Sequence, residues 1–148
     1  MGHPYHHALS SVCKWGGAGD NYTGFYQELS ARSGQTWRIA GYVMTPVSNR
    51  ISGASTCDIK IEFLGPSGLL ATYFAPPITS NLAAGAYYSF STSAVAPAGV
   101  TIARFTVVYI QRGNASGEVF IDDASLSLNT ISASGISCQG VLPNLAPA

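Results

Sequence analysis

Alternation of apolar and polar residues with a period of two is the feature that most constrains this chain. In the segment TWRIAGYVMT, Trp37, Ile39 and Val43 fall on one side of an extended strand, while Arg38 and Tyr42 fall on the other. The segment CDIKIEFLG alternates in the same way, and the GPSG that follows predicts a turn that returns the chain as a second strand, LLATYF. No convincing helix start accompanies these patterns. The chain is therefore expected to be all-β.

Further segments of strand length lie between Gly, Pro, Ser and Asn residues, at about 24–30, 87–93, 102–111 and 118–128. Because 148 residues can form one domain that buries about two thirds of its unfolded surface, these strands are expected to share a single core. We predict a two-sheet antiparallel β-sandwich. The predicted division is an N-terminal arm with a first strand, the sandwich and a Pro-rich tail, over 1–20, 21–128 and 129–148.

The charge content excludes several classes of partner. Charged residues make up 9% of the chain, seven basic residues balance seven acidic ones, and no cluster of Lys and Arg occurs. Nucleic acid and anionic membrane surfaces are therefore not expected as partners, and no apolar run approaches the roughly 18 residues of a membrane span. Such low charge is typical of extracellular or assembled proteins, so the predicted location is extracellular or on a virion surface. The three cysteines are widely spaced and do not establish a redox compartment.

The sequence gives little support for catalysis. The three histidines, His3, His6 and His7, lie near the start of the chain without metal-ligand spacing to Cys or Asp. Cys57 stands beside Asp58 but has no neighbouring histidine that could activate a thiolate. The Gly-rich GGAG segment lacks the GK[ST] ending of a phosphate-binding loop. The chain is therefore expected not to be an enzyme.

Four segments in order carry a resemblance to a known family, and they are GFYQELSARSGQTWRIAGYV, IKIEFLGPSGLL, SFSTSAVAPAGVTIARFTVVY and GEVFIDDASLSL. Together they resemble the carbohydrate-binding modules of the family 4/9/22 type over about residues 24–128. In those modules an aromatic-Gln strand, a Ser-Gly turn, an APAG…AR corner and a closing IDD strand follow in this order. The resemblance implies a β-jelly-roll of galactose-binding-like architecture and a non-catalytic module that binds glycan or polysaccharide.

Two adjacent acidic residues, Asp122 and Asp123, interrupt the closing strand, although strands disfavour acidic residues. In the resembling modules an Asp of this strand helps to hold a structural Ca²⁺, which takes about six to eight oxygen ligands. Those modules also open with an acidic strand that has no counterpart here. Two interpretations stay open: a Ca²⁺ ligand, or a carboxylate that accepts backbone N–H bonds. In a regular strand the two side chains would point to opposite faces, which would exclude the close carboxylate pair of a glycoside hydrolase.

Glycan recognition needs flat aromatic rings that stack on sugar C–H groups and planar polar groups that pair with hydroxyls. The resemblance predicts one binding sheet, built from the 38–44, 59–64 and 103–111 strands. The candidate ligand-binding residues are Trp15, Tyr42, Lys60, Glu62, Arg104 and Gln111, of which Gln111 has inward parity and would need a bulge. The aromatic residues with core parity are Trp37, Phe63, Phe90, Phe105 and Phe120.

A competing function comes from the segment RFTVVYIQR. Its outward positions include Val108 and Ile110, although a solvated sheet would be polar on that side. A covered outer face is typical of a subunit in a larger assembly. The alternative prediction is therefore a structural or adhesive surface protein that self-assembles or joins a larger assembly. That assembly would be a virion, with the chain as a capsid decoration or tail-fibre protein, or an extracellular filament.

Overall fold

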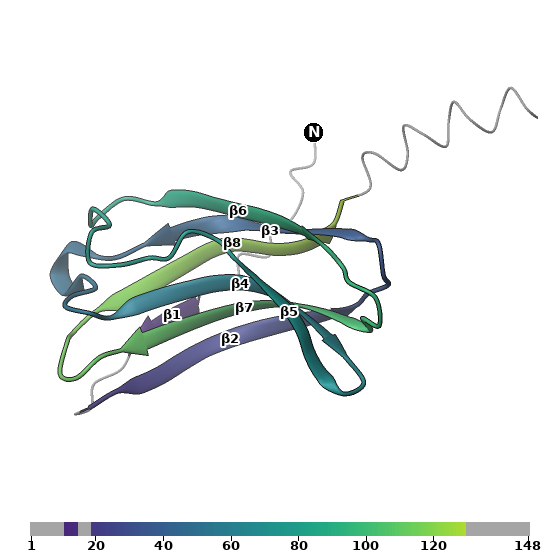
Figure 1. Cartoon of the computed structure of the whole chain (residues 1–148). Coiled ribbons are helices and arrows are strands. Elements are labelled where there is room, and N and C mark those ends of the chain that lie inside the picture. Colours follow the sequence, from purple (N-terminus) through teal and green to yellow (C-terminus); the bar gives the residue numbers. More distant parts are fainter. Residues whose placement is uncertain (1–10, 15–18, 130–148) are drawn as a thin grey trace, which may run out of the picture.

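The computed structural model describes residues 11–14, as backbone, and residues 19–129. Eight strands and one short 3₁₀ helix make up these parts (Figure 1), and their bounds are β1 Ser11–Lys14, β2 Asn21–Ser30, β3 Thr36–Met44, η1 Val47–Asn49, β4 Thr56–Gly65, β5 Gly68–Phe74, β6 Tyr88–Val95, β7 Ile102–Gln111 and β8 Glu118–Leu128. The predicted strands are thus present within a few residues of their expected bounds. The predicted tail, and most of the predicted arm, lie outside the described residues. No helix in the described ranges is long and apolar enough to cross a membrane.

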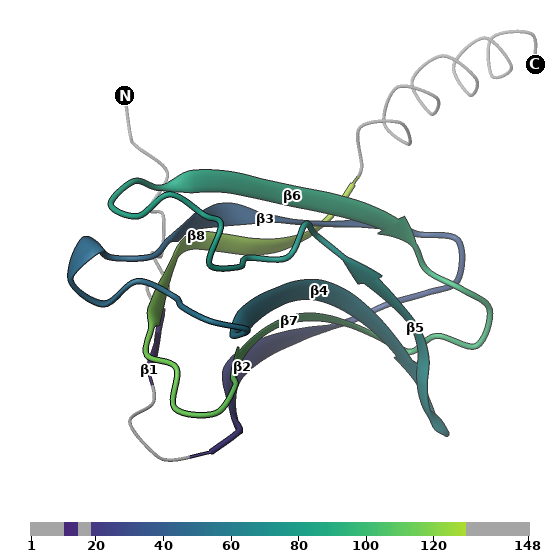
Figure 2. The same cartoon turned by 60° about the vertical axis from the view of Figure 1, so that its left-hand side comes forward.

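The strands form two four-stranded antiparallel sheets that pack face to face (Figures 1 and 2). One sheet has the order β1-β8-β3-β6 and the other has the order β2-β7-β4-β5. Successive described strands alternate between the two sheets, except that β4 and β5 form a hairpin within one sheet. This strand order is that of a jelly roll, so the predicted all-β sandwich is confirmed.

The core lies between the sheets and is formed by the inward positions of the alternating segments. Ile59, Ile61 and Phe63 of β4 are fully buried, and Phe105 and Val107 of β7 lie beside them. The β3 positions with the same predicted parity are also buried. The period-two pattern therefore identified the inner faces of these three strands correctly.

A β-bulge interrupts β8 and changes which residues face the core. Val119 and Ile121 are fully buried before the bulge, and Leu126 is buried after it, so the inward parity shifts by one residue. Phe120 therefore faces outward and is only partly buried, which makes its predicted core position wrong. The bulged residue is Asp123, whose φ of 48° lies in the left-handed region that Asp tolerates better than most residues.

The bulge also overturns the expectation that the two adjacent aspartates point to opposite faces. Asp122 pairs with Tyr42 on the outer face of the sheet, and Asp123 lines a hollow on that same face. A regular strand would have sent one of them inward. The extra residue at the bulge lets both carboxyl groups avoid the core, which removes the cost of burying a charge.

Candidate binding face

The sheet β2-β7-β4-β5 is curved, and in Figure 2 its concave side is turned away from the other sheet. We call this surface the concave face. Strand register arranges its outward side chains in rows that run across the sheet. From one end to the other, the rows are Tyr22–Ile110–Thr56, Gly24–Val108–Asp58, Tyr26–Thr106–Lys60–Phe74, Glu28–Arg104–Glu62–Thr72 and Ser30–Ile102–Leu64.

Aromatic rings stand at both sides of the concave face. Tyr22 and Tyr26 lie on the edge strand β2 and are 60% and 64% exposed, and Phe74 on the opposite edge strand β5 is 57% exposed. Tyr26 and Phe74 belong to the same row and are separated by two strands, which corresponds to roughly 14 Å between their backbones. Large aromatic rings so exposed contribute little to folding. They are available to a ligand that lies between them.

A network of charged and polar groups fills the centre of the concave face. Glu62, which is 8% exposed, receives a hydrogen bond of 2.9 Å from the Thr106 hydroxyl and an ion pair of 2.8 Å from Lys60 Nζ. Arg104 Nη1 lies 3.6 Å from the same carboxylate. Arg104 also binds Glu28, with a distance of 2.8 Å from Nε to Oε1. The central side chains are therefore held in place by one another.

The electrostatics of Glu62 follow from these contacts. Burial would raise the pKa of Glu62, but the hydrogen bonds from Lys60 and Thr106 and the charges of Lys60 and Arg104 outweigh it and lower the pKa. The pKa of Arg104 is raised, mainly by its hydrogen bond to Glu28. The centre of the face therefore carries ionised groups of both signs at neutral pH.

The same cations orient the aromatic rings. The Arg104 guanidinium lies over the Tyr26 ring, 4.9 Å from its centroid, and Lys60 Nζ lies 5.8 Å from the centroid of the Phe74 ring. Each exposed ring is thus fixed by a cation that is itself held by Glu62 or Glu28. Aromatic and charged groups form one connected surface.

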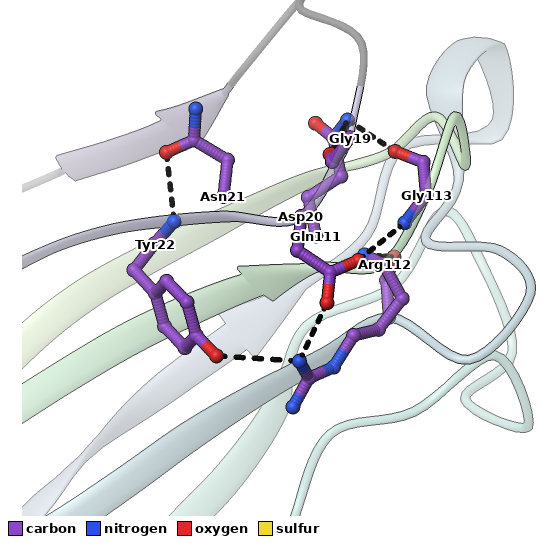
Figure 3. Close-up of polar contacts among 8 residues, drawn as sticks. Gly19, Asp20, Asn21, Tyr22, Gln111, Arg112 and Gly113 are labelled. Atoms are coloured by element: carbon purple, nitrogen blue, oxygen red, sulfur yellow. Dashed lines mark hydrogen bonds and ion pairs between the residues drawn. The ribbon is translucent and has the colours of Figure 1, made fainter.

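A separate ion pair lies at the end of the concave face where β2 begins (Figure 3). The Asp20 carboxylate accepts a hydrogen bond of 2.8 Å from the Gly113 backbone and one of 2.9 Å from Arg112 Nη1. Arg112 Nη1 also lies 3.2 Å from the Tyr22 hydroxyl. The Gly113 N–H and then Arg112 lower the pKa of Asp20. The exposed Tyr22 ring is therefore tied to the loop between β7 and β8.

The floor beside Tyr22 is apolar. Val108 and Ile110 are partly buried and face outward on β7, as the alternation predicted. Opposite Val108 stands Gly24, where an added Cβ would lie 2.1 Å from the Val107 carbonyl oxygen. This close approach requires glycine and leaves the floor open between Tyr22 and Tyr26.

The structure brings together three of the six predicted ligand-binding residues, Lys60, Glu62 and Arg104. Gln111 is buried, and its amide donates to the Gly113 carbonyl oxygen at 3.0 Å, so it does not reach the concave face. Trp15 lies outside the described residues. The roles of all six in binding stay predictions.

The predicted binding sheet is wrong in one strand. Thr36–Met44 belongs to the sheet β1-β8-β3-β6, so Tyr42 lies on the opposite side of the molecule from Lys60 and Glu62. The edge strand of the concave face is instead Asn21–Ser30, whose Tyr22 and Tyr26 were not among the six candidates, although Tyr22 was expected in or near a loop at the rim. The shared parity of Tyr22, Gly24, Tyr26 and Glu28 was the signal in the sequence that could have revealed them.

A structural Ca²⁺ at Asp122 and Asp123 stays a prediction. In the described ranges no three His, Cys, Asp or Glu side chains gather closely enough to hold a metal ion. Asp122 Oδ1 accepts a hydrogen bond of 2.9 Å from the Asp123 backbone N–H, which is the contact expected of a carboxylate that caps the backbone. Any ion at this place would need backbone or water oxygens in addition to the two carboxylates.

Comparison with known proteins gives a fold and no sequence family. No family model matches the chain, and no curated protein matches it. The enzymatically active domain of tailspike protein 4 from bacteriophage CBA120 is similar, with a TM-score of 0.57 and 16% identity over 80% of this chain. The match covers 15% of that tailspike chain, so this chain spans a small part of its length.

Two carbohydrate-binding modules have the same fold. Family 16 carbohydrate-binding module 2 matches with a TM-score of 0.56 and 11% identity over 80% of this chain and 75% of its own. TmCBM61 in complex with β-1,4-galactotriose matches with a TM-score of 0.51 and 16% identity over 81% of this chain and 70% of its own. At such low identities the similarity shows the fold. The β-sandwich of carbohydrate-binding modules, expected from the resemblance, is confirmed for this chain.

Proposed function

We propose that this chain is a non-catalytic module that binds a glycan on its concave face. The observation that carries this proposal is the row Tyr26–Thr106–Lys60–Phe74, in which two exposed rings enclose polar groups. Sugars present apolar C–H patches and a rim of hydroxyls, and they are bound by stacking together with hydrogen bonds to planar polar groups. This row supplies both kinds of contact, and Glu62 and Arg104 of the adjacent row add to the polar part.

The network around Glu62 would favour binding by lowering its entropic cost. Lys60 and Arg104 are long side chains whose ordering on ligand binding would otherwise oppose association. Here their ion pairs with Glu62 and Glu28 already order them. A ligand hydroxyl would meet donors and acceptors that are already in position.

The ligand class and the location belong to the same proposal. Several rows of aromatic and polar side chains follow one another along the strands of the concave face, which suits a chain of sugar units better than a single sugar. The similar folds of two carbohydrate-binding modules, one of them in complex with β-1,4-galactotriose, support a glycan or polysaccharide as the ligand. Such a ligand is met outside the cell, so we place the protein in an extracellular setting or on a virion surface.

Tyr26→Ala tests this proposal. Loss of the stacking ring is expected to weaken binding by about 1–1.5 kcal/mol, which is roughly a tenfold rise in Kd, on a polysaccharide found by screening an array of soluble glycans. Because Tyr26 is 64% exposed, its removal should leave the melting temperature nearly unchanged. Tyr87→Ala is the matched control, since Tyr87 is also exposed, at 46%, and lies before β6 away from the concave face.

Two results would contradict the proposal. One is an array on which the wild-type chain binds no glycan. The other is a glycan that Tyr26→Ala and Tyr87→Ala bind as tightly as the wild type does.

A second candidate function is assembly, and the edge strand β5 favours it. Four of its large apolar side chains are exposed, and they are Leu69, Leu70, Tyr73 and Phe74. The strand contains neither proline nor a charged residue, which are the usual protections of a sheet edge against pairing with another chain. A surface subunit of a virion or filament would use such an edge. Self-association measurements distinguish this function from glycan binding.

A further inference from the structure

The outer face of the other sheet carries a trough lined by small side chains. We call it the serine trough. Its floor is the row Ser91–Ala40–Ser125, which crosses the neighbouring strands β6, β3 and β8. Arg38 and Tyr42 stand on either side of this floor on β3, about 13 Å apart along the strand. The hollow between them has a volume of about 690 Å³.

Three functional groups of the serine trough have no partner within the described part of the chain. Neither the Arg38 guanidinium, nor the Tyr42 hydroxyl, nor the Asp123 carboxylate makes a hydrogen bond or ion pair there. On the concave face, by contrast, Arg104, Lys60 and Glu62 are bound to one another. Arg38, Tyr42 and Asp123 are therefore available to a ligand, while the Ser125 hydroxyl donates a hydrogen bond of 3.4 Å to the Ala40 carbonyl oxygen.

The bulge in β8 is what brings the acidic group to this place. Without the extra residue, the alternation would turn Asp123 toward the core. With φ at 48°, Asp123 instead lines the same hollow as Arg38 and Tyr42. Backbone in this region is disfavoured for residues other than glycine, and such positions are often kept where they serve a site.

We propose that the serine trough is a second glycan-binding site, which takes a neutral sugar chain lying across β6, β3 and β8. Tyr42, which is 45% exposed, provides a ring for stacking. Arg38 and Asp123 are the one cation and one anion that line the hollow, and Asp122 lies beside Tyr42 on the same face, so the charges do not favour an acidic ligand. Exposed serine hydroxyls at positions 89, 91 and 125 complete a lining that pairs with ligand hydroxyls.

The chemistry of the serine trough argues against a protein partner. Protein interfaces have an apolar centre, with aromatic and aliphatic anchors. The floor here consists of two serines and an alanine, and the buried Phe90 ring lies beneath Gly41. Tyr42 is the large ring that is exposed in the hollow, and the other exposed lining groups are small or polar. A polyhydroxylated chain fits such a lining better.

The two sites lie on opposite sheets, so each can be tested without the other. One molecule with both sites would bind two sugar chains at once and would cross-link a long soluble polysaccharide. The inference does not need the concave face to bind. It concerns residues that the concave-face proposal does not use.

The experiment is a titration of the full chain, by calorimetry in chelator, with hexasaccharides of β-1,4-linked glucose, xylose and galactose and of β-1,3-linked glucose. Tyr42→Ala removes the stacking ring, and Ser91→Tyr blocks the floor at an exposed strand position that tolerates tyrosine. Tyr26→Ala is the variant of the concave face, and Tyr87→Ala is the control for the loss of an exposed ring. Melting curves establish that each variant is folded.

The expected result is two sites per wild-type chain and one strong site in Tyr42→Ala and in Ser91→Tyr, with binding at the altered site weakened at least about tenfold. Tyr87→Ala should keep both sites. If the wild type has one site that Tyr26→Ala weakens and the trough variants do not, the proposal of a site in the serine trough is wrong and the proposal of a site on the concave face is supported. If the trough variants remove binding and Tyr26→Ala does not, the proposal of a site in the trough is supported and the proposal of a site on the concave face is wrong. Absence of binding to every hexasaccharide overturns both.

Discussion

Glu62→Gln is the substitution that most directly tests the charge network of the concave face. Glutamine has the size of glutamate but no charge, and it has one acceptor oxygen where the carboxylate has two. In the structure, Glu62 Oε1 binds Lys60 at 2.8 Å and Oε2 accepts the Thr106 hydrogen bond at 2.9 Å. The substitution therefore replaces two charge-assisted contacts with weaker neutral ones.

The expected cost follows from the burial of this site. Hydrogen bonds to charged groups contribute about 1.5–3 kcal/mol and neutral ones about 0.5–1.5 kcal/mol, and Glu62 is 8% exposed, so water replaces little of the loss. The Thr106 hydroxyl can rotate and accept from the new amide. We therefore expect Glu62→Gln to lower the free energy of unfolding by about 2 kcal/mol at pH 7, which shifts the urea midpoint by roughly 1 M for a slope of about 2 kcal/mol per M.

The effect should depend on pH in a defined direction. The pKa of Glu62 is lower in the folded chain than in the unfolded chain, so the ionised carboxylate stabilises the fold above the usual Glu pKa of about 4.3. This contribution is lost as the pH falls through the lower pKa of the folded state. A protonated carboxyl resembles the Gln amide, with one acceptor and one donor side. The difference in unfolding free energy between wild type and Glu62→Gln should therefore nearly vanish at the acid end.

Urea unfolding of both proteins at several pH values between 7 and 3 measures this difference. Glu28→Gln is the control, because Glu28 is more exposed and pairs with Arg104 at the surface, where the loss should stay below about 1 kcal/mol. A difference for Glu62→Gln that is the same at pH 7 and at the acid end would refute the reasoning. So would a cost at pH 7 no larger than that of Glu28→Gln.

Two further predictions concern calcium and assembly. If Asp122 and Asp123 hold a structural Ca²⁺, the melting temperature should rise with added Ca²⁺ by mass action, at millimolar concentrations because the site has few carboxylates. Asp→Asn at the residue that binds the ion should abolish this rise. Superimposable melting curves in Ca²⁺ and in chelator would contradict the prediction. If the apolar floor of the concave face is an interface, Val108→Glu or Ile110→Glu should convert an oligomer into a folded monomer, because an unpaired charge disfavours the buried contact. Light scattering that reports a monomeric wild type at high concentration would count against this prediction.

The sequence predicted the fold better than the site. Alternation in β3, β4 and β7 identifies their inner faces, because a strand with one buried face must repeat with period two. The same pattern does not say which sheet a strand joins. β3 therefore looked like a neighbour of β4, although the chain crosses between sheets at every connection of the described strands except the β4–β5 hairpin. That single misplacement moved Tyr42 to the wrong side of the molecule.

Two other errors have separate causes. The bulge at Asp123 adds one residue to β8. The alternation in the part of β8 after the bulge, when extended back to Phe120, therefore places Phe120 on the wrong face. Tyr26 was missed for a different reason. Its value as a binding residue depends on its register with Thr106 and on Phe74 at the far edge of the sheet, and neither pairing is encoded near it in the sequence.

The two outer faces achieve polarity in different ways, and this difference bears on affinity. On the concave face, Glu62 is held by Lys60 and Thr106, so a ligand meets an ordered surface but must compete with existing ion pairs for each polar group. In the serine trough, Arg38 and Asp123 have no partner among residues 19–129, so a ligand would break no contact there but must order both side chains itself. Binding at the trough should therefore carry the larger entropic cost. A long sugar chain held first by the concave face of one molecule would offset that cost at the trough of the next through its high local concentration.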